Sequence, residues 1–131
     1  MFASYFQNTI YVQIRRNHLR IRHIESNREG TFPAETPFST QRLLVGEFRV
    51  AEDLLKRAVK EVSRRGFFSV GPHVVIHPME MVEGGLSEVE QRLLQEFAIG
   101  AARASKVVVW AGVELSDAEV KAKLSEHKRA R

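Results

Sequence analysis

The stretch from Pro72 to Trp110 constrains the fold of this chain more than any other part of it. It reads as an apolar run (HVVIH), a loop (PMEMVEGG), a helix-forming segment (LSEVEQRLLQEFAIGAARA) and a second apolar run (KVVVW). Two buried strands joined by one crossover helix make a βαβ unit, in which the two strands are parallel. We therefore predict an α/β fold with a mixed sheet covered by helices.

The segment before this unit predicts strands. Residues 9–25 contain two β-rich runs separated at Arg16-Asn17, and Asn tolerates the positive φ of a tight hairpin turn. The second run places Leu19, Ile21 and His23 on one face, and Arg20, Arg22 and Ile24 on the other. Residues 26–40 are predicted as loop, with a third, edge strand near Thr36–Thr40.

Two helices flank the βαβ unit in the prediction. From Phe48 to about Arg64, apolar residues recur at helical spacing, and Gly66 marks the end of that helix. A last helix is predicted to begin at Ser116, with Glu119 completing a capping box. Leu115 and Val120 form the accompanying hydrophobic staple.

The crossover helix itself is predicted to start at Ser87, whose hydroxyl pairs with Glu90 in a capping box. Its apolar stripe is expected at Val89, Leu93, Leu94, Phe97 and Ala101. The element order is then β-β-β-α-β-α-β-α. This connectivity is that of the ribonuclease H-like fold, the half-unit of actin-like ATPases, with a mixed five-stranded sheet.

Length and composition indicate a single domain spanning residues 1–131, since a chain with 44% hydrophobic residues can bury its own core. The chain has no cysteine, which agrees with a reducing compartment. The first residues do not follow the pattern of a signal peptide, and the longest apolar run is shorter than the roughly 18 residues of a membrane span. We expect a soluble cytoplasmic protein without a membrane span.

The net charge of +4 is concentrated at the C-terminal end. From Lys121 onward there are five basic residues and one acid, so the rest of the chain is formally neutral. We expect a basic tail that frays from about residue 125, and we regard the overall charge as weak evidence for a nucleic-acid partner.

Three long strings, YVQIRRN, FSTQRLLVGEFRVAEDLL and EMVEGGLSEVEQRLLQE, are similar to the YjaA family of small proteobacterial proteins. They are spread over most of the chain, from Tyr11 to Glu96. The resemblance implies a role in a stress response and names no activity.

A more distant resemblance is to the first subdomain of the bacterial actin MreB, carried by VGEFRVAEDLLKRAVKEV, PHVVIHP, GLSEVEQRLLQEFAIGA and KVVVW in that order. It implies the fold, but the functional residues of that family are not found here. The phosphate-binding turn of MreB needs Asp followed by Gly-Thr, whereas this hairpin reads Gln13 to Asn17. Ala111-Gly112-Val113 takes the place of the catalytic Glu-Pro segment.

No catalytic, cofactor-binding or metal site is therefore predicted, and the protein is not expected to be an enzyme. Nuclease chemistry of the ribonuclease H type needs an Asp on the first strand, which TIYVQIRR lacks. His73 and His77 share a strand face without a third ligand. Four acids near the start of the crossover helix could form a Mg²⁺ site, but we interpret them as solvated carboxylates or carboxylates favourably placed at a helix N-terminus: Glu80, Glu83, Glu88 and Glu90.

Two surfaces remain as candidate contact sites. The first is a group of hairpin arginines suited to phosphate or carboxylate recognition, with pairing to Glu25, Glu29 or Glu35 as the alternative: Arg15, Arg16, Arg20 and Arg22. The second is the strand Lys106–Trp110, which we expect at a sheet edge, with Val108 and Trp110 as contacts.

These surfaces lead to two functional hypotheses. The first is a non-catalytic domain that acts through a protein partner or a homodimer, in a stress response. The alternative is a nucleic-acid-binding module that uses the arginine hairpin and the basic tail.

Overall fold

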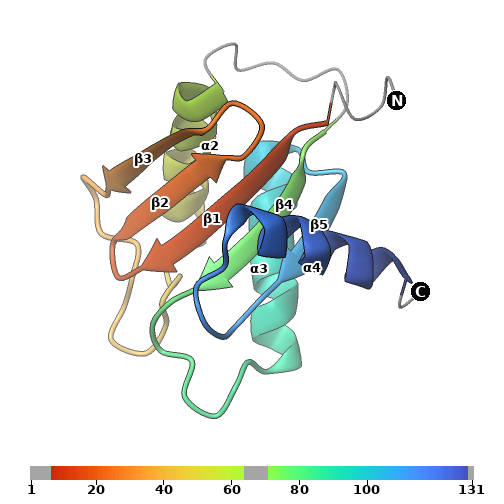
Figure 1. Ribbon diagram of the computed structural model, residues 1–131. Coiled ribbons are helices and arrows are strands. Elements are labelled where there is room, and N and C mark those ends of the chain that lie inside the picture. Colours follow the sequence, from red (N-terminus) through yellow and green to blue (C-terminus); the bar gives the residue numbers. More distant parts are fainter. Residues whose placement is uncertain (1–6, 64–70, 130–131) are drawn as a thin grey trace.

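A mixed five-stranded sheet with helices on both faces forms the protein, here a computed structural model that describes residues 7–63 and 71–129 (Figure 1). The strands are β1 (Thr9–Arg15), β2 (His18–His23), β3 (Arg28–Pro33), β4 (His73–Pro78) and β5 (Lys106–Val109). The helices are α2 (Phe48–Ser63), α3 (Glu88–Ala102) and α4 (Asp117–Arg129). The strand order is β3-β2-β1-β4-β5.

The pairing of these strands confirms the predicted α/β class and the mixed five-stranded sheet. β1, β2 and β3 pair antiparallel, whereas β4 is parallel to both β1 and β5. The crossover from β4 to β5 through α3 is the βαβ unit expected from Pro72 to Trp110.

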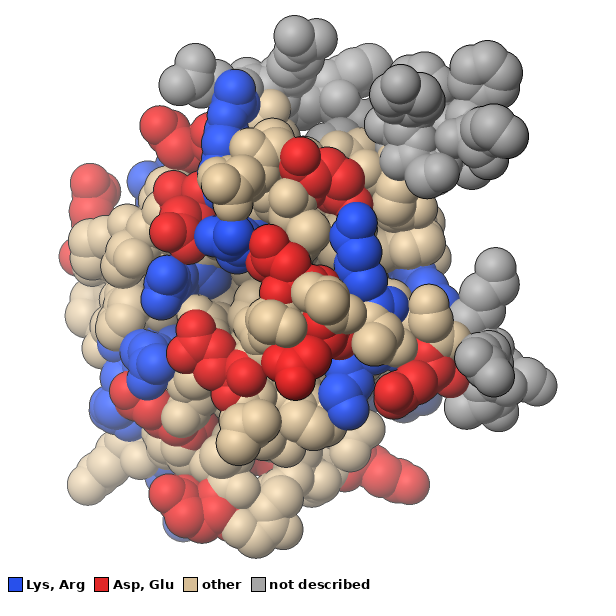
Figure 2. Space-filling model, viewed as in Figure 1, with Lys and Arg blue, Asp and Glu red and all other residues tan. Residues whose placement is uncertain are grey.

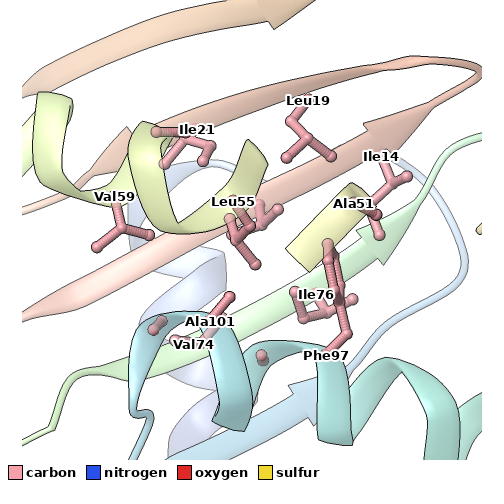
Figure 3. Packing of buried hydrophobic residues seen from close by; sticks show 14 of the residues in the cluster. Ile14, Leu19, Ile21, Ala51, Leu55, Val59, Val74, Ile76, Phe97 and Ala101 are labelled. Atoms are coloured by element: carbon pink, nitrogen blue, oxygen red, sulfur yellow. The ribbon is translucent and has the colours of Figure 1, made fainter. Parts of the chain in front are cut away.

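The main core lies between the sheet and the pair α2 and α3, which cover its rear face in Figure 1. Apolar side chains from alternate positions of the strands meet the buried faces of the two helices, as Figure 3 shows for Leu19 and Ile21 against α2. Leu55 and Phe97 are fully buried at the centre of the two helix faces. The alternation of β1 and β2 follows from the two-residue period of a strand.

A second, smaller core lies on the opposite face, under α4. It contains Leu115, Val120 and Leu124 from the α4 region, packed on Tyr11 and Val75 of the sheet. Leu115 and Val120 thus pack in one cluster, as the predicted staple requires.

The hairpin turn lies where it was predicted. Asn17 has φ of +60°, and Arg15 pairs with His18 across the two-residue turn. The Asn17 side chain also organises the loop after β3, because its Oδ1 accepts hydrogen bonds from the amides of Phe38 and Ser39, both 2.8 Å long.

The predicted position of the third strand was wrong. Arg28–Pro33 forms β3, and residues 36–40 form a loop. Asn27, at φ of +59°, turns the chain back directly after β2, so β3 pairs with β2 before the proline-rich segment begins. Charged residues and Gly30 concealed this strand, because an edge strand tolerates them.

The helix starts agree with the prediction. Both reciprocal bonds of the capping box are present at Ser87 with Glu90 and at Ser116 with Glu119. One position of the crossover-helix stripe was wrong, since Val89 is 75% exposed. It lies in the first turn of α3, and the core contact of this helix begins near Leu93.

The C-terminal ends of α2 and α4 can be compared with their predicted positions as far as the described residues reach. α2 is described to Ser63, and the expected end at Arg64 to Gly66 lies outside the described residues. α4 continues to Arg129, past residue 125, where we had expected the basic tail to begin to fray.

Candidate functional site

The α4 side of the sheet carries two rows of side chains that run across the strands. Gln13 lies opposite Arg20 on β2 and opposite His77 on β4. Tyr11 lies opposite Arg22 in the next row. α4 packs over β4 and β5, while the part of this face over β2 and β3 stays open (Figure 1).

A buried phenol and imidazole lie under the start of α4. The Tyr11 hydroxyl is 2.7 Å from His77 Nδ1, and the two rings stack with centroids 5.9 Å apart. The backbone amide of Leu115 donates to the same hydroxyl at 3.0 Å, and Gln13 Nε2 donates at 3.3 Å. His77 Nε2 lies 2.9 Å from the Gly112 carbonyl oxygen. The network therefore joins β1 and β4 to the loop that leads into α4.

These contacts decide where the protons lie. Because a carbonyl oxygen can only accept, we assign the proton of neutral His77 to Nε2, which donates to Gly112. Nδ1 then accepts from the Tyr11 hydroxyl. Burial lowers the pKa of His77 and raises the pKa of Tyr11, so both groups are neutral at pH 7. Such a satisfied network has the pattern of a structural element.

A groove of about 470 Å³ lies beside this network, between the open part of the sheet and the start of α4. Its volume falls within the range of small-molecule sites, about 300–1,000 Å³. The lining comes from three strands and from the α4 start: Tyr11, Gln13, Arg20, Arg22, Glu29 and residues 114–118.

An arginine–aspartate pair connects the sheet to α4 at this groove. Arg22 Nε is 2.7 Å from Asp117 Oδ1, and Arg22 Nη2 is 3.1 Å from Oδ2, so the contact is bidentate. Glu29 Oε1 accepts from both Arg22 and Arg20, at 3.1 and 3.2 Å. Hydrogen bonding to Arg22 lowers the pKa of Asp117, and hydrogen bonding to Arg20 lowers the pKa of Glu29. The two arginines and the two carboxylates balance each other in formal charge.

The structure separates the four predicted arginines. Only Arg20 and Arg22 line the groove, and both pair with Glu29, the alternative that the sequence left open. Arg16 lies at the hairpin turn, where its amide donates to Glu80 Oε1 at 3.2 Å. Arg15 ends β1 and is half-buried. Figure 2 shows basic and acidic side chains interspersed over this face, with no continuous basic patch.

The strand Lys106–Val109 lies at the sheet edge, as predicted. Val108 is half-buried against the smaller core. Trp110, just after β5, is held by its own chain: its Nε1 donates to the Val113 carbonyl at 2.8 Å, and Lys123 Nζ lies 4.0 Å from the ring centroid.

The histidines and acids considered as metal ligands are dispersed. His77 is fully buried and bonded to Tyr11, whereas the side chain of His73 is half-buried at the other end of β4. Glu90 belongs to the α3 capping box. Within residues 7–63 and 71–129, no three His, Asp or Glu side chains come together in a way that could hold a metal ion.

Sequence reasoning missed the Tyr11–His77 pair and the groove. The alternation of β1 could have placed Tyr11 and Gln13 on one face, but two partners of the Tyr11 hydroxyl, His77 and Leu115, are 66 and 104 residues away. The one available signal was a histidine within an apolar strand, HVVIH, which demands a hydrogen-bond partner if it is buried.

Comparison with known proteins adds one relative. The uncharacterized protein YjaA of Escherichia coli (strain K12) is 41% identical over 99 residues, which cover 72% of this chain and 76% of that protein. The chain belongs to the YjaA family. No protein-family profile matches it. The name of the YjaA relative states no activity, so the family relationship leaves the function open.

No helix within residues 7–63 and 71–129 combines the length and the apolar character that a bilayer-spanning segment requires.

Proposed function

We propose that this YjaA-family protein is a non-catalytic domain that acts through protein–protein contact at the β5 edge of its sheet, first of all with a second copy of itself. The observation that carries the proposal is the difference between the two sheet edges. β3 presents charged residues and Pro33, which discourage strand addition. β5 reads Lys-Val-Val-Val, with Lys106 alone as a charged residue.

The hydrogen bonds of β5 indicate which backbone groups point outward. The Trp110 amide donates to the Ile76 carbonyl of β4, at 2.9 Å. Because successive residues of a strand alternate, the N–H and C=O groups of Val107 and Val109 point away from β4. In the described part of the chain β5 is the outermost strand, so these groups are available to an added strand.

The finer fold assignment is part of this proposal. The order β3-β2-β1-β4-β5, with two antiparallel partners followed by two parallel ones, supports a ribonuclease H-like, actin-like half-domain. The non-catalytic role is supported by the first strand, where uncharged Tyr11 and Gln13 face the groove instead of carboxylates. The link to a stress response stays a prediction drawn from the family resemblance.

The proposal is tested by the mass of the protein in solution and by one proline variant. Val109→Pro removes an N–H that points away from β4 and leaves the hydrogen bonds to β4 intact. An edge strand tolerates proline at such an outward-facing position. We expect the parent to be a dimer by light scattering and Val109→Pro to be a folded monomer. Val109→Ala, which truncates the side chain but keeps the N–H, should remain a dimer.

If the parent protein is monomeric at high concentration, its partner is not a second copy of itself. A Val109→Pro variant that is folded and still dimeric would show that the dimer uses another surface.

The nucleic-acid hypothesis is the less supported of the two. Two of its four arginines are paired with carboxylates, and the charges on this face are mixed. We expect the purified protein to carry no RNA or DNA whose retention falls with salt, the behaviour that phosphate contacts produce. Salt-sensitive retention that is lost on replacing Arg15 and Arg16 would favour the nucleic-acid role.

A further inference from the structure

The side-chain amide of Gln13 lines the groove beside α4, and only its nitrogen forms a hydrogen bond with another described residue. Gln13 is 3% exposed, and its Nε2 donates to Tyr11. The amide cannot be reversed, because the Tyr11 hydroxyl proton is already donated to His77. Within the described chain nothing bonds to Gln13 Oε1. Every buried side-chain oxygen and nitrogen of the described residues has a hydrogen-bond partner. Because Gln13 Oε1 has no partner among these residues, this oxygen must be accessible, and we infer that it is reached from the groove that Gln13 lines.

The groove also offers free donors next to Gln13. Arg20 is the cross-strand neighbour of Gln13 and gives one guanidinium N–H to Glu29, out of five. Its side chain is 48% exposed. On the opposite wall, the amides of Asp117 and Ala118 precede the first intrahelical bond of α4, which runs from Val120 to the Ser116 carbonyl.

One carboxylate of the lining remains without a partner. Glu114 is exposed, and none of the ion pairs or hydrogen bonds among the described side chains involves it. Arg20 and Arg22 are balanced by Glu29 and Asp117, so Glu114 leaves the groove with one excess negative charge. A ligand that is only an anion would be repelled by this charge, and one that is only a cation would leave the donors unused.

We propose that the groove binds a small zwitterion, with an ammonium group on Glu114 and a carboxylate on Arg20 and the free α4 amides. Gln13 supplies an acceptor and a donor between the two ends. Free α-amino acids and short peptides with both termini free belong to this class, and a volume of about 470 Å³ accommodates either. The β5 edge plays no part in this site, so the inference is independent of the proposed function.

Glycylglycine and two blocked analogues test the proposal. Glycylglycine carries both charges, N-acetylglycylglycine lacks the ammonium, and glycylglycinamide lacks the carboxylate. Each is titrated into the ¹⁵N-labelled protein at neutral pH, and the signals of the Gln13 side-chain amide and of the Asp117 and Ala118 amides are followed. We expect saturable shifts with glycylglycine and at least about tenfold weaker binding of each analogue, because each loses one charge-assisted contact.

Two substitutions assign the charges. Glu114→Gln should weaken glycylglycine binding about tenfold. It should not weaken the binding of N-acetylglycylglycine, which has no ammonium and is repelled by the Glu114 charge in the parent. Arg20→Gln should weaken glycylglycine and N-acetylglycylglycine alike. Glu83→Gln, an exposed acid outside the groove, is the matched control and should bind glycylglycine as the parent does.

Equal affinity for the three probes, shifts without saturation, or shifts confined to other parts of the protein would overturn the proposal. It would also be overturned if Glu114→Gln bound glycylglycine as tightly as the Glu83→Gln control.

Discussion

Replacing Tyr11 by Phe tests the interpretation of the buried network most directly. The substitution keeps the ring but removes the hydroxyl that donates to His77 and accepts from the Leu115 amide. His77 Nδ1 and the Leu115 amide would each lose a buried hydrogen bond, and Gln13 Nε2 would lose the longer one, of 3.3 Å. Each orphaned buried group costs about 1–3 kcal/mol, so we expect the free energy of unfolding to fall by about 2–5 kcal/mol.

Urea denaturation followed by the fluorescence of Trp110, the one tryptophan, measures this loss. The matched control is Ser105→Ala, which removes an exposed hydrogen bond of 2.7 Å to the Gly71 carbonyl. Water can replace that bond, so the control should change stability by no more than about 0.5 kcal/mol.

Combining Tyr11→Phe with His77→Leu completes the test. The two losses should not add, because each variant removes the same contact, and a coupling of about 0.5–3 kcal/mol is expected. If Tyr11→Phe costs no more than Ser105→Ala, the hydroxyl is not the buried link that we describe.

Two further predictions concern pH and the helix caps. Because burial lowers the pKa of His77, the unfolded chain binds more protons than the folded one below about pH 6.5, so stability should fall on acidification from about pH 7 to 5. Urea midpoints should show a shallower fall for His77→Leu; an equal slope would contradict the assignment. Ser87→Ala and Ser116→Ala should each lower thermal stability by about 0.5–2 kcal/mol, more for Ser87 because α3 packs on the main core, with exposed Ser125→Ala as the control. Melts indistinguishable from that control would mean that the capping bonds contribute nothing.

The β5 edge shows how far reasoning from the sequence extended into function. The apolar run KVVVW predicted a strand, and the βαβ pattern placed it beside β4. The structure adds that Trp110 is engaged by Lys123 and Val113 of its own chain. A contact at this edge would therefore rest on the backbone of β5 more than on the aromatic side chain that the sequence singled out.

Features that depend on neighbouring residues could be predicted from the amino-acid pattern: the turn at Asn17, the capping boxes at Ser87 and Ser116, and the strand-helix-strand order from Pro72 to Trp110. Each of these follows from interactions within about four residues, so the local pattern is sufficient.

Three features depend on long-range packing: the groove, the Tyr11–His77 contact across 66 residues and the Arg22–Asp117 pair across 95. These contacts require the strand order and the register of the sheet, and a shift of one residue would turn Tyr11 and Gln13 to the other face. The local pattern says that Gln13 and His77 alternate with apolar neighbours. Which groups they meet depends on how distant segments pack, because the free energy that selects that packing comes from the whole core.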